Sequence, residues 1–143
     1  MRRISLTDGL TGVLNRRGFD VALRTQTAMA RRYHHPVSVI ALDLDHFKRI
    51  NDTFGHAAGD CVLMSVASIL MEETRTEIDV VGRVGGEEFM ILLPHTTLPG
   101  AAAVAERIRQ RIAATPVTFN DGDIPVTSSL GVREYVFDED PEK

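Results

Sequence analysis

The chain alternates between two hydrophobic periods, and each change of period marks a predicted element. From about residue 15 to residue 33 the apolar positions recur at helical spacing, and Pro36 ends this pattern. Residues 37–42, VSVIAL, form a compact β-branched run that predicts a strand buried on both faces. A polar segment follows, and an apolar stripe within residues 62–70 predicts a second helix.

The second half of the chain continues with two short apolar runs and a third helix. Residues 79–84, DVVGRV, and 88–94, EFMILLP, predict two strands joined by a Gly-Gly pair, which is typical of a tight two-residue hairpin. Residues 104–112 repeat at helical spacing, and alternation across residues 124–132 predicts a final strand. After the leading helix the order is β-α-β-β-α-β. This order predicts an α+β fold of the ferredoxin-like or palm-like type, an antiparallel sheet with helices packed on one face.

Length and composition limit the class of protein. With 143 residues the chain suits a single domain, residues 1–143. Its one cysteine, Cys61, excludes an internal disulfide and favours a cytoplasmic setting. No apolar stretch reaches the length of a membrane span, and the N-terminus lacks the apolar region of a signal peptide. A net charge of −4 argues against a nucleic-acid-binding surface, so a small anionic substrate would need a cation.

Acidic side chains stand where two predicted strands meet. Asp43 follows the first strand, while Glu87 and Glu88 precede the third. Because these strands are central antiparallel neighbours in a β-α-β-β-α-β sheet, we expect Asp43 and Glu87 to converge at one edge. Carboxylates this close repel each other unless a cation neutralises them, and Mg²⁺ prefers oxygen ligands. The pattern therefore predicts a metal site, against the alternative that each acidic residue is only solvated.

The segment after the first strand adds further polar groups. The stretch DLDHFKRIND begins like an EF-hand loop, but Phe47 stands at the fifth ligand position and Lys48 at the obligatory glycine, so we set a calcium loop aside. A turn near Lys48 predicts a phosphate cradle of backbone N–H groups with the lysine as a point charge. Asn51 and Asp60 offer an amide and a carboxylate that can read the edge of a guanine. The alternative is that each of them only caps a helix.

Four stretches of the chain together carry a family resemblance. They are LTDGLTGVLNRRGF, ALDLDHFKRINDTFGHAAGD, RVGGEEFMILLP and VTSSLGV, and they extend in this order from Thr7 to about Tyr135. In sequence and spacing they resemble the GGDEF domain, the catalytic module of bacterial diguanylate cyclases. Several long motifs in one order are a far more specific signal than a lone glycine-rich turn.

The resemblance implies an enzyme of bacterial second-messenger signalling. Two GTP molecules would condense to cyclic di-GMP and pyrophosphate, with Mg²⁺ or Mn²⁺ as the metal. Each domain would bind one GTP, and a second copy of the domain would face it so that each 3′-hydroxyl attacks the other α-phosphate. The resemblance further implies a cytoplasmic domain with an upstream sensor domain, whether or not the parent protein is tethered to a membrane, and no nucleic-acid partner.

The same resemblance assigns roles to individual residues. Asp43 and Glu87 would be metal ligands together with the carbonyl of Leu44. Glu87 and Glu88 would be catalytic, Glu88 as a further acidic ligand or as a base for the hydroxyl. The matches to the substrate-binding positions are Asn51 and Asp60 for the guanine, and His46, Phe47 and Lys48 for the phosphates.

Two departures from the family pattern change the expectation. The motif reads GGEEF, with Glu87 where aspartate is usual, and both residue types can ligate Mg²⁺. The product-inhibition motif R-x-x-D corresponds to residues 76–79, where Thr76 replaces the arginine and Arg75 stands one position too early. Threonine cannot reproduce the bidentate grip of a guanidinium on phosphate. We therefore expect a degenerate inhibitory site that keeps only Asp79.

The C-terminal end of the chain also departs from the family pattern, and more than one function fits the motifs. The sequence stops at Lys143, before the helix whose lysine and arginine grip the triphosphate in the family, so the domain is expected to lack that helix. A diguanylate cyclase is the first hypothesis, and a catalytically silent GGDEF-like module that binds GTP and regulates a partner is the alternative. A more remote alternative is another nucleotidyl-transferring enzyme on a palm-like sheet. The intact acidic residues and amide favour the first hypothesis over the second.

Overall fold

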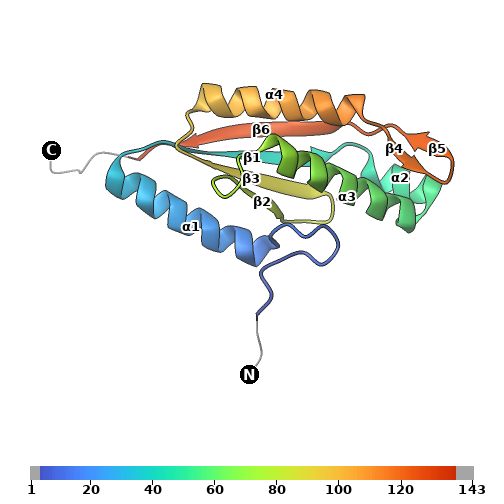
Figure 1. The fold of residues 1–143 in the computed structure, drawn as a ribbon, viewed down its shortest axis with the longest axis horizontal. Coiled ribbons are helices and arrows are strands. Elements are labelled where there is room, and N and C mark those ends of the chain that lie inside the picture. Colours follow the sequence, from blue (N-terminus) through green and yellow to red (C-terminus); the bar gives the residue numbers. More distant parts are fainter. Residues whose placement is uncertain (1–3, 138–143) are drawn as a thin grey trace.

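A four-stranded antiparallel sheet forms the centre of the computed structural model, which describes residues 4–137 (Figure 1). The strand order is β2-β3-β1-β6. The central strands are β1 (Val37–Leu44) and β3 (Glu88–Pro94), and the edge strands are β2 (Val80–Arg83) and β6 (Ser128–Tyr135). The predicted α+β fold is confirmed, with the first and third strands of the split unit as neighbours. The extreme N-terminus and the acidic C-terminal stretch lie outside the described residues.

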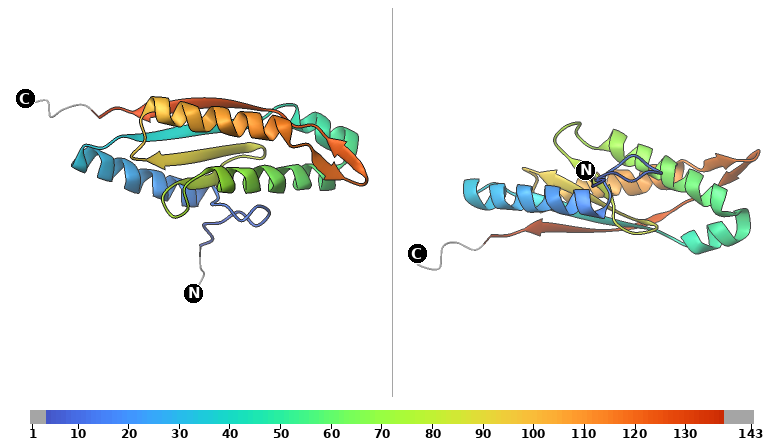
Figure 2. Two further views of the ribbon diagram at one scale, coloured as in Figure 1. Left: turned by 45° about the horizontal axis from the view of Figure 1, so that its top comes forward. Right: turned by 90° about the horizontal axis from the view of Figure 1, so that it is seen from below.

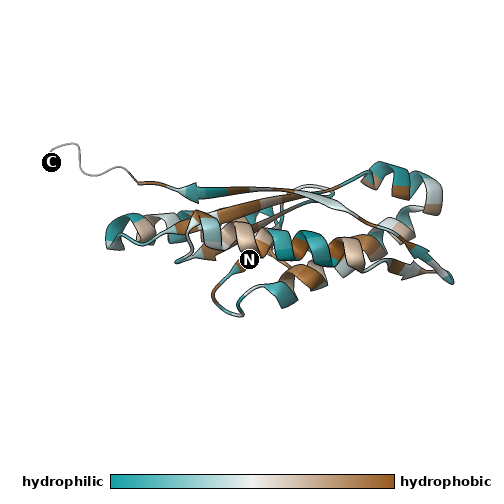
Figure 3. Ribbon diagram, turned by 90° about the horizontal axis from the view of Figure 1, so that it is seen from above, coloured by the Kyte–Doolittle hydropathy of each residue, from teal (hydrophilic) through white to brown (hydrophobic). Residues whose placement is uncertain are grey.

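Helices cover both faces of this sheet. α3 (His56–Glu73) and α4 (Leu98–Ala114) pack on one face, where their apolar side chains share a buried cluster with Ile40 of β1. α1 (Arg16–Tyr33) packs on the other face, in a second cluster that contains Val39 (Figure 2). Successive residues of β1 thus contribute to opposite clusters, as strand geometry requires. Each helix carries both hydrophobic and hydrophilic residues, as expected of helices that pack one side against a sheet (Figure 3).

A short helix occupies the segment that the periodicity predicts as a loop. α2 (Phe47–Phe54) follows β1 directly and buries Phe47 and Ile50, which are one turn apart. Gly55 separates α2 from α3 with a φ of +94°, a conformation that side chains disfavour, and its N–H donates to the Asn51 carbonyl at 2.8 Å. The sequence pattern missed α2 because a helix this short shows only one apolar repeat.

The hairpin between β2 and β3 differs from the predicted two-residue turn. The Val84 N–H donates to the Glu88 carbonyl at 2.9 Å, which leaves residues 85–87 as the loop. Neither glycine of this loop has the positive φ that a type I′ turn requires. Instead, the Arg83 guanidinium donates to the Gly86 carbonyl at 2.8 and 3.1 Å and holds the wider loop in place.

The predicted final strand is split in the structure. β4 (Val117–Phe119) and β5 (Gly122–Ile124) form a separate two-stranded sheet, and β6 begins only at Ser128. The apolar alternation continues through the break because Ile124 and Val126 are both buried in the main core. Within residues 4–137, no helix has the length and apolar content that crossing a membrane requires.

The segment before α1 is bound to the β2–β3 hairpin. The Leu14 N–H donates to the Val81 carbonyl at 3.1 Å, and the Leu14 carbonyl accepts from the Arg83 N–H at 2.8 Å. The Asp8 carboxylate accepts from the N–H and the hydroxyl of Thr11 at 3.0 and 2.6 Å, and it pairs with Arg83 at 3.3 Å. Burial raises the pKa of Asp8, but the bonds from Thr11 and the charge of Arg83 outweigh it and lower the pKa below its ordinary value.

Asp8 should make the free energy of unfolding depend on pH. Because its pKa is lower in the folded than in the unfolded chain, its stabilisation is complete above the unfolded pKa of about 3.9 and is lost as the pH falls through the folded pKa. Asp8→Asn should therefore cost about 1–2 kcal/mol at neutral pH and much less near pH 3, as measured by urea unfolding. Asp20→Asn, at an exposed position of α1, is the control. An equal loss at both pH values would contradict this role.

Candidate active site

Two carboxylates face each other across the central strands. Asp43 lies opposite Glu88 in the antiparallel register, and the Leu44 N–H donates to the Glu87 carbonyl at 3.2 Å. This bonding makes Asp43 and Glu88 a non-hydrogen-bonded pair, whose side chains are the closest cross-strand neighbours in a sheet. Both residues are exposed. Like charges directly opposite each other destabilise a sheet, so this pair gains from a bound cation.

The register of β1 and β3 decides which glutamate of the GGEEF loop lies opposite Asp43. The sequence predicted that Asp43 and Glu87 converge at one edge; the residue directly opposite Asp43 is Glu88, and Glu87, half-buried, is next to it and bonded through its carbonyl to Leu44. The Glu88 side chain folds over Gly85, because a Cβ on that glycine would lie 3.1 Å from Glu88 Cδ and 3.3 Å from Oε1. The glycine therefore gives the Glu88 carboxylate room to lie against the loop.

Asp45 is a residue of this edge to which the sequence pattern gave no role. Its carboxylate accepts from the hydroxyls of Thr127 and Ser129 at 2.9 and 2.6 Å, and its N–H donates to the Thr127 carbonyl at 3.0 Å. These bonds tie the end of β1 to the start of β6. The spacing of Asp43 and Asp45 by two positions was the available signal, because such residues share one face of a strand. Of the two, only Asp45 has carboxylate oxygens that accept hydrogen bonds from described residues.

The predicted phosphate segment lies at the start of α2. His46 has a left-handed φ of +56° and precedes the helix without a side-chain cap. The N–H groups in the first turn of a helix have no intrahelical acceptor, so they can meet an anion. The Phe47 side chain is buried, with 8% exposed, so only its backbone can take part. Lys48 is exposed and can act as a point charge.

Asn51 and Asp60 lie inside helices, which excludes the capping alternative. Asn51 belongs to α2, and Asp60 belongs to α3, whose N-cap is Gly55. Neither side chain makes a hydrogen bond to any residue within 4–137 that would give it a structural role. The Asn51 Oδ1 atom is buried without a partner. Unsatisfied buried polar atoms are rare, and the other side-chain atom of this kind among the described residues is Ser128 Oγ.

The oxygen atoms at this edge fit a hard divalent cation. Within the described part of the chain, no three or more His, Cys, Asp or Glu side chains are grouped to hold a metal ion. A metal would therefore depend on two carboxylates from Asp43 and the GGEEF loop together with backbone carbonyls. Mg²⁺ is commonly bound in this way, with water and substrate phosphates in the remaining positions. The residues present fit such an ion.

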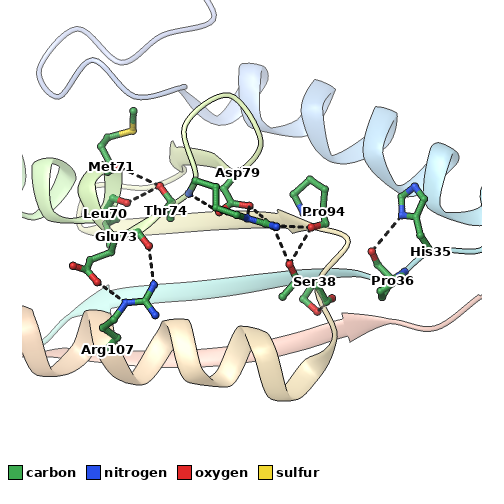
Figure 4. A network of polar contacts seen from close by, with 12 residues as sticks. His35, Pro36, Ser38, Leu70, Met71, Glu73, Thr74, Asp79, Pro94 and Arg107 are labelled. Carbon is green, nitrogen blue, oxygen red and sulfur yellow. Dashed lines mark hydrogen bonds and ion pairs between the residues drawn. The ribbon is translucent and has the colours of Figure 1, made fainter.

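The expected inhibitory segment is folded on itself. The Arg75 guanidinium donates to Asp79 at 2.7 Å, and its Nη2 also reaches the Pro94 carbonyl at 2.8 Å and Thr96 Oγ1 at 3.0 Å. The Asp79 side chain is only 3% exposed, within the polar network that joins it to Pro94 and Ser38 (Figure 4). Thr76, at the position where the family has arginine, is exposed. The Asp79 carboxylate is thus buried and bound to Arg75, whose side chain is 47% exposed while its guanidinium is engaged by Asp79, Pro94 and Thr96.

The arginines of α4 are structural rather than an anion site. Each is paired with a glutamate, and two of them connect α4 to the C-terminal end of α3. The pairs are Arg107–Glu73, Arg111–Glu73, Arg111–Glu72 and Arg109–Glu106, at distances from 2.6 to 2.9 Å. The hydrogen bonds from Arg107 and Arg111 lower the pKa of the Glu73 carboxyl, although burial opposes the shift. Arg107 and Arg111 therefore connect α4 to α3, which packs on the same face of the sheet.

Comparisons with known proteins identify the family of this chain. Residues 5–143 match the family described as "Diguanylate cyclase, GGDEF domain". The chain is 42% identical over 134 residues to the diguanylate cyclase DgcP of Pseudomonas aeruginosa, which covers 94% of this chain and 20% of that protein. It spans between 20% and 36% of the length of the curated relatives that it matches first.

Solved structures show the same fold. The GGDEF domain of DgcB from Caulobacter crescentus, in complex with c-di-GMP, has a TM-score of 0.88 and 34% identity, and the match covers 95% of this chain and 81% of that one. The active GGEEF domain of a diguanylate cyclase from Vibrio cholerae has a TM-score of 0.80 and 38% identity, covering 88% and 80% of the two chains. By motif, fold and overall sequence, this chain belongs to the GGDEF family of diguanylate cyclase domains.

Proposed function

We propose that this domain is a diguanylate cyclase that condenses two GTP molecules to cyclic di-GMP and pyrophosphate. The observation that carries the proposal is the opposition of Asp43 and Glu88 beside the GGEEF loop. An exposed pair of like charges costs free energy of folding, and a cation bound with substrate phosphates offsets that cost. Similarity to the active GGEEF domain from Vibrio cholerae supports the same reaction and shows that a glutamate in the third motif position is compatible with activity in that protein.

The metal-binding role falls to the end of β1 and the hairpin loop. Asp43, Glu87 and the Leu44 carbonyl would hold Mg²⁺ or Mn²⁺. The bound metal supplies charge stabilisation for the α-phosphate oxygens and lowers the pKa of the attacking hydroxyl. Glu88, whose carboxylate rests over Gly85, serves as a further ligand or accepts the hydroxyl proton.

Substrate recognition is assigned to the two helices that follow β1. His46, Lys48 and the backbone of Phe47 would bind the phosphates at the start of α2. The Asn51 amide and the Asp60 carboxylate would bind the guanine, because an amide and a carboxylate complement its acceptors and donors. The support for this assignment is that neither side chain has another partner within residues 4–137.

The reaction requires two copies of the site. The 3′-oxygen of one GTP attacks the α-phosphorus of the other, the bond to the β-phosphate oxygen breaks, and pyrophosphate leaves as the hydroxyl proton passes to a base. A second transfer closes the ring, so two domains must face each other. An upstream sensor domain in the parent protein would bring the copies together, in keeping with the short share of its relatives that this chain spans.

Loss of the Glu88 charge should abolish turnover. Glu88→Gln keeps the size of the side chain but removes its basicity and its charge, so the rate of cyclic di-GMP formation should fall by about 100-fold or more. The measurement is chromatographic detection of product from GTP and Mg²⁺ with the domain held as a dimer in its parent protein. Glu106→Gln, exposed on α4, is the matched control and should keep the unsubstituted rate.

The same assay separates the two hypotheses of function. If the unsubstituted protein binds GTP and yields no product, the domain is a silent binding module and the proposal fails. If Glu88→Gln retains the full rate of synthesis, the role of Glu88 is wrong even though the enzyme is active.

Feedback inhibition through residues 76–79 should be weak or absent. Residues 76–79 contain no cation, and the neighbouring Arg75 guanidinium is bound to Asp79 and the Pro94 carbonyl, so a phosphate finds no free guanidinium at the position of the family's arginine. Titration of cyclic di-GMP into initial-rate assays should leave turnover unchanged at low micromolar product. Thr76→Arg restores the missing guanidinium and should make turnover more sensitive to product. Strong inhibition of the unsubstituted protein that disappears in Asp79→Ala would show that this site is functional.

A further inference from the structure

Gly59 lies against the side chain of Asn51. It belongs to α3, directly before Asp60, and a Cβ at this position would lie 1.8 Å from Asn51 Oδ1, 2.9 Å from Asn51 Cγ and 3.2 Å from Phe47 Cζ. Non-bonded heavy atoms do not approach to 1.8 Å, so any residue other than glycine would displace the Asn51 amide. The position of the Asn51 amide therefore requires that residue 59 have no side chain.

Backbone conformation does not explain the glycine. Gly59 is buried within α3 and lacks the positive φ of Gly12 and Gly55, so an alanine backbone would fit there. Glycine is also a poor helix former compared with alanine. A glycine in mid-helix without a conformational need points to close packing, and the group packed against it is the Asn51 amide.

The contact also determines which end of the amide meets a ligand. Oδ1 is the buried atom without a partner and lies on Gly59, which leaves Nδ2 as the end that can face a bound base. Nδ2 is a hydrogen-bond donor, whereas the Asp60 carboxylate on the next residue of α3 is an acceptor. Guanine carries an acceptor at O6 where adenine carries an amino donor. A donor held in one rotamer therefore favours guanine over adenine.

We infer that Gly59 is a positioning residue for purine selectivity: because it has no side chain, the Asn51 amide can lie against it with Oδ1 buried and Nδ2 available as a hydrogen-bond donor to the base. This inference rests on the proposed function, because it takes the nucleotide bound between α2 and α3 to be GTP. It adds a residue that contacts no substrate and acts only through Asn51.

A double-substitution cycle tests the inference. Gly59→Ala should weaken GTP binding by about tenfold and reduce the preference for GTP over ATP by a similar factor. The same substitution in an Asn51→Ala background should change GTP affinity by less than about twofold, because the displaced group is no longer there. Affinities are measured by calorimetric titration of the domain within its parent protein, with each nucleotide and Mg²⁺. Additive losses in the cycle would overturn the inference.

A matched glycine controls for the effect of alanine in a helix. Gly100 lies in the first turn of α4, and its Cβ would meet Thr96 Cγ2 at 3.2 Å and Thr97 Oγ1 at 3.8 Å, neither of which belongs to the candidate site. Gly100→Ala should therefore leave both GTP affinity and nucleotide preference unchanged. A loss of affinity in Gly100→Ala equal to that in Gly59→Ala would show a general effect and count against the role of Gly59.

A structural readout keeps the inference separate from the proposed function. In a crystal structure of Gly59→Ala without nucleotide, the Asn51 amide should have left its position against residue 59, and in the double variant Phe47 should shift by only a few tenths of an ångström. An unmoved amide would overturn the inference whatever the protein binds. If the unsubstituted chain binds no GTP but the amide moves as expected, the proposed function fails while the control of Asn51 by Gly59 stands.

Discussion

The pairing of β1 with β3 is the constraint on which the rest of the site depends. The register runs from Val37 opposite Pro94 to Asp43 opposite Glu88, and most of the apolar residues between these ends are buried by helices on both faces. A slip by one residue would turn each apolar side chain of β1 to the wrong face. Burial, at about 25 cal/mol per Å² of apolar surface, therefore holds two carboxylates together that repel each other. Burial of the core therefore offsets the repulsion between the two carboxylates when no cation is bound.

Charged and polar groups of this domain fall into two sets. One set consists of charged side chains that form ion pairs within the chain and stabilise the fold. Examples are Arg75 with Asp79 and Arg83 with Asp8. In contrast, Asn51 leaves a buried oxygen without a partner. Proteins rarely leave such atoms unsatisfied, and they give up local stability mainly where a site requires it.

The sequence predicted a helix or strand correctly where one hydrophobic period runs through the whole element. It failed where the backbone geometry of a turn or a short segment determines the structure. The β-branched run of β1 and the long stripes of α1, α3 and α4 were predicted, and with them the order of the split unit. α2 was missed because eight residues give a single apolar repeat. A two-residue turn was predicted at Gly85-Gly86, whereas the loop is residues 85–87, because a Gly-Gly pair does not reveal the bonds from Arg83 to the Gly86 carbonyl. β4 and β5 were merged with β6 because apolar alternation runs through the break.

By itself the sequence determined the fold class, the family and the residue types of the site, because these follow from local periodicity and from motifs that are contiguous along the chain. Tertiary structure alone decided that Glu88 rather than Glu87 faces Asp43, that Asp45 is bound to Thr127 and Ser129, and that Gly59 lies on the Asn51 amide. Each of these facts depends on the register of two strands or on the approach of two helices. Such distances between separate elements are set by packing, and no local pattern encodes them.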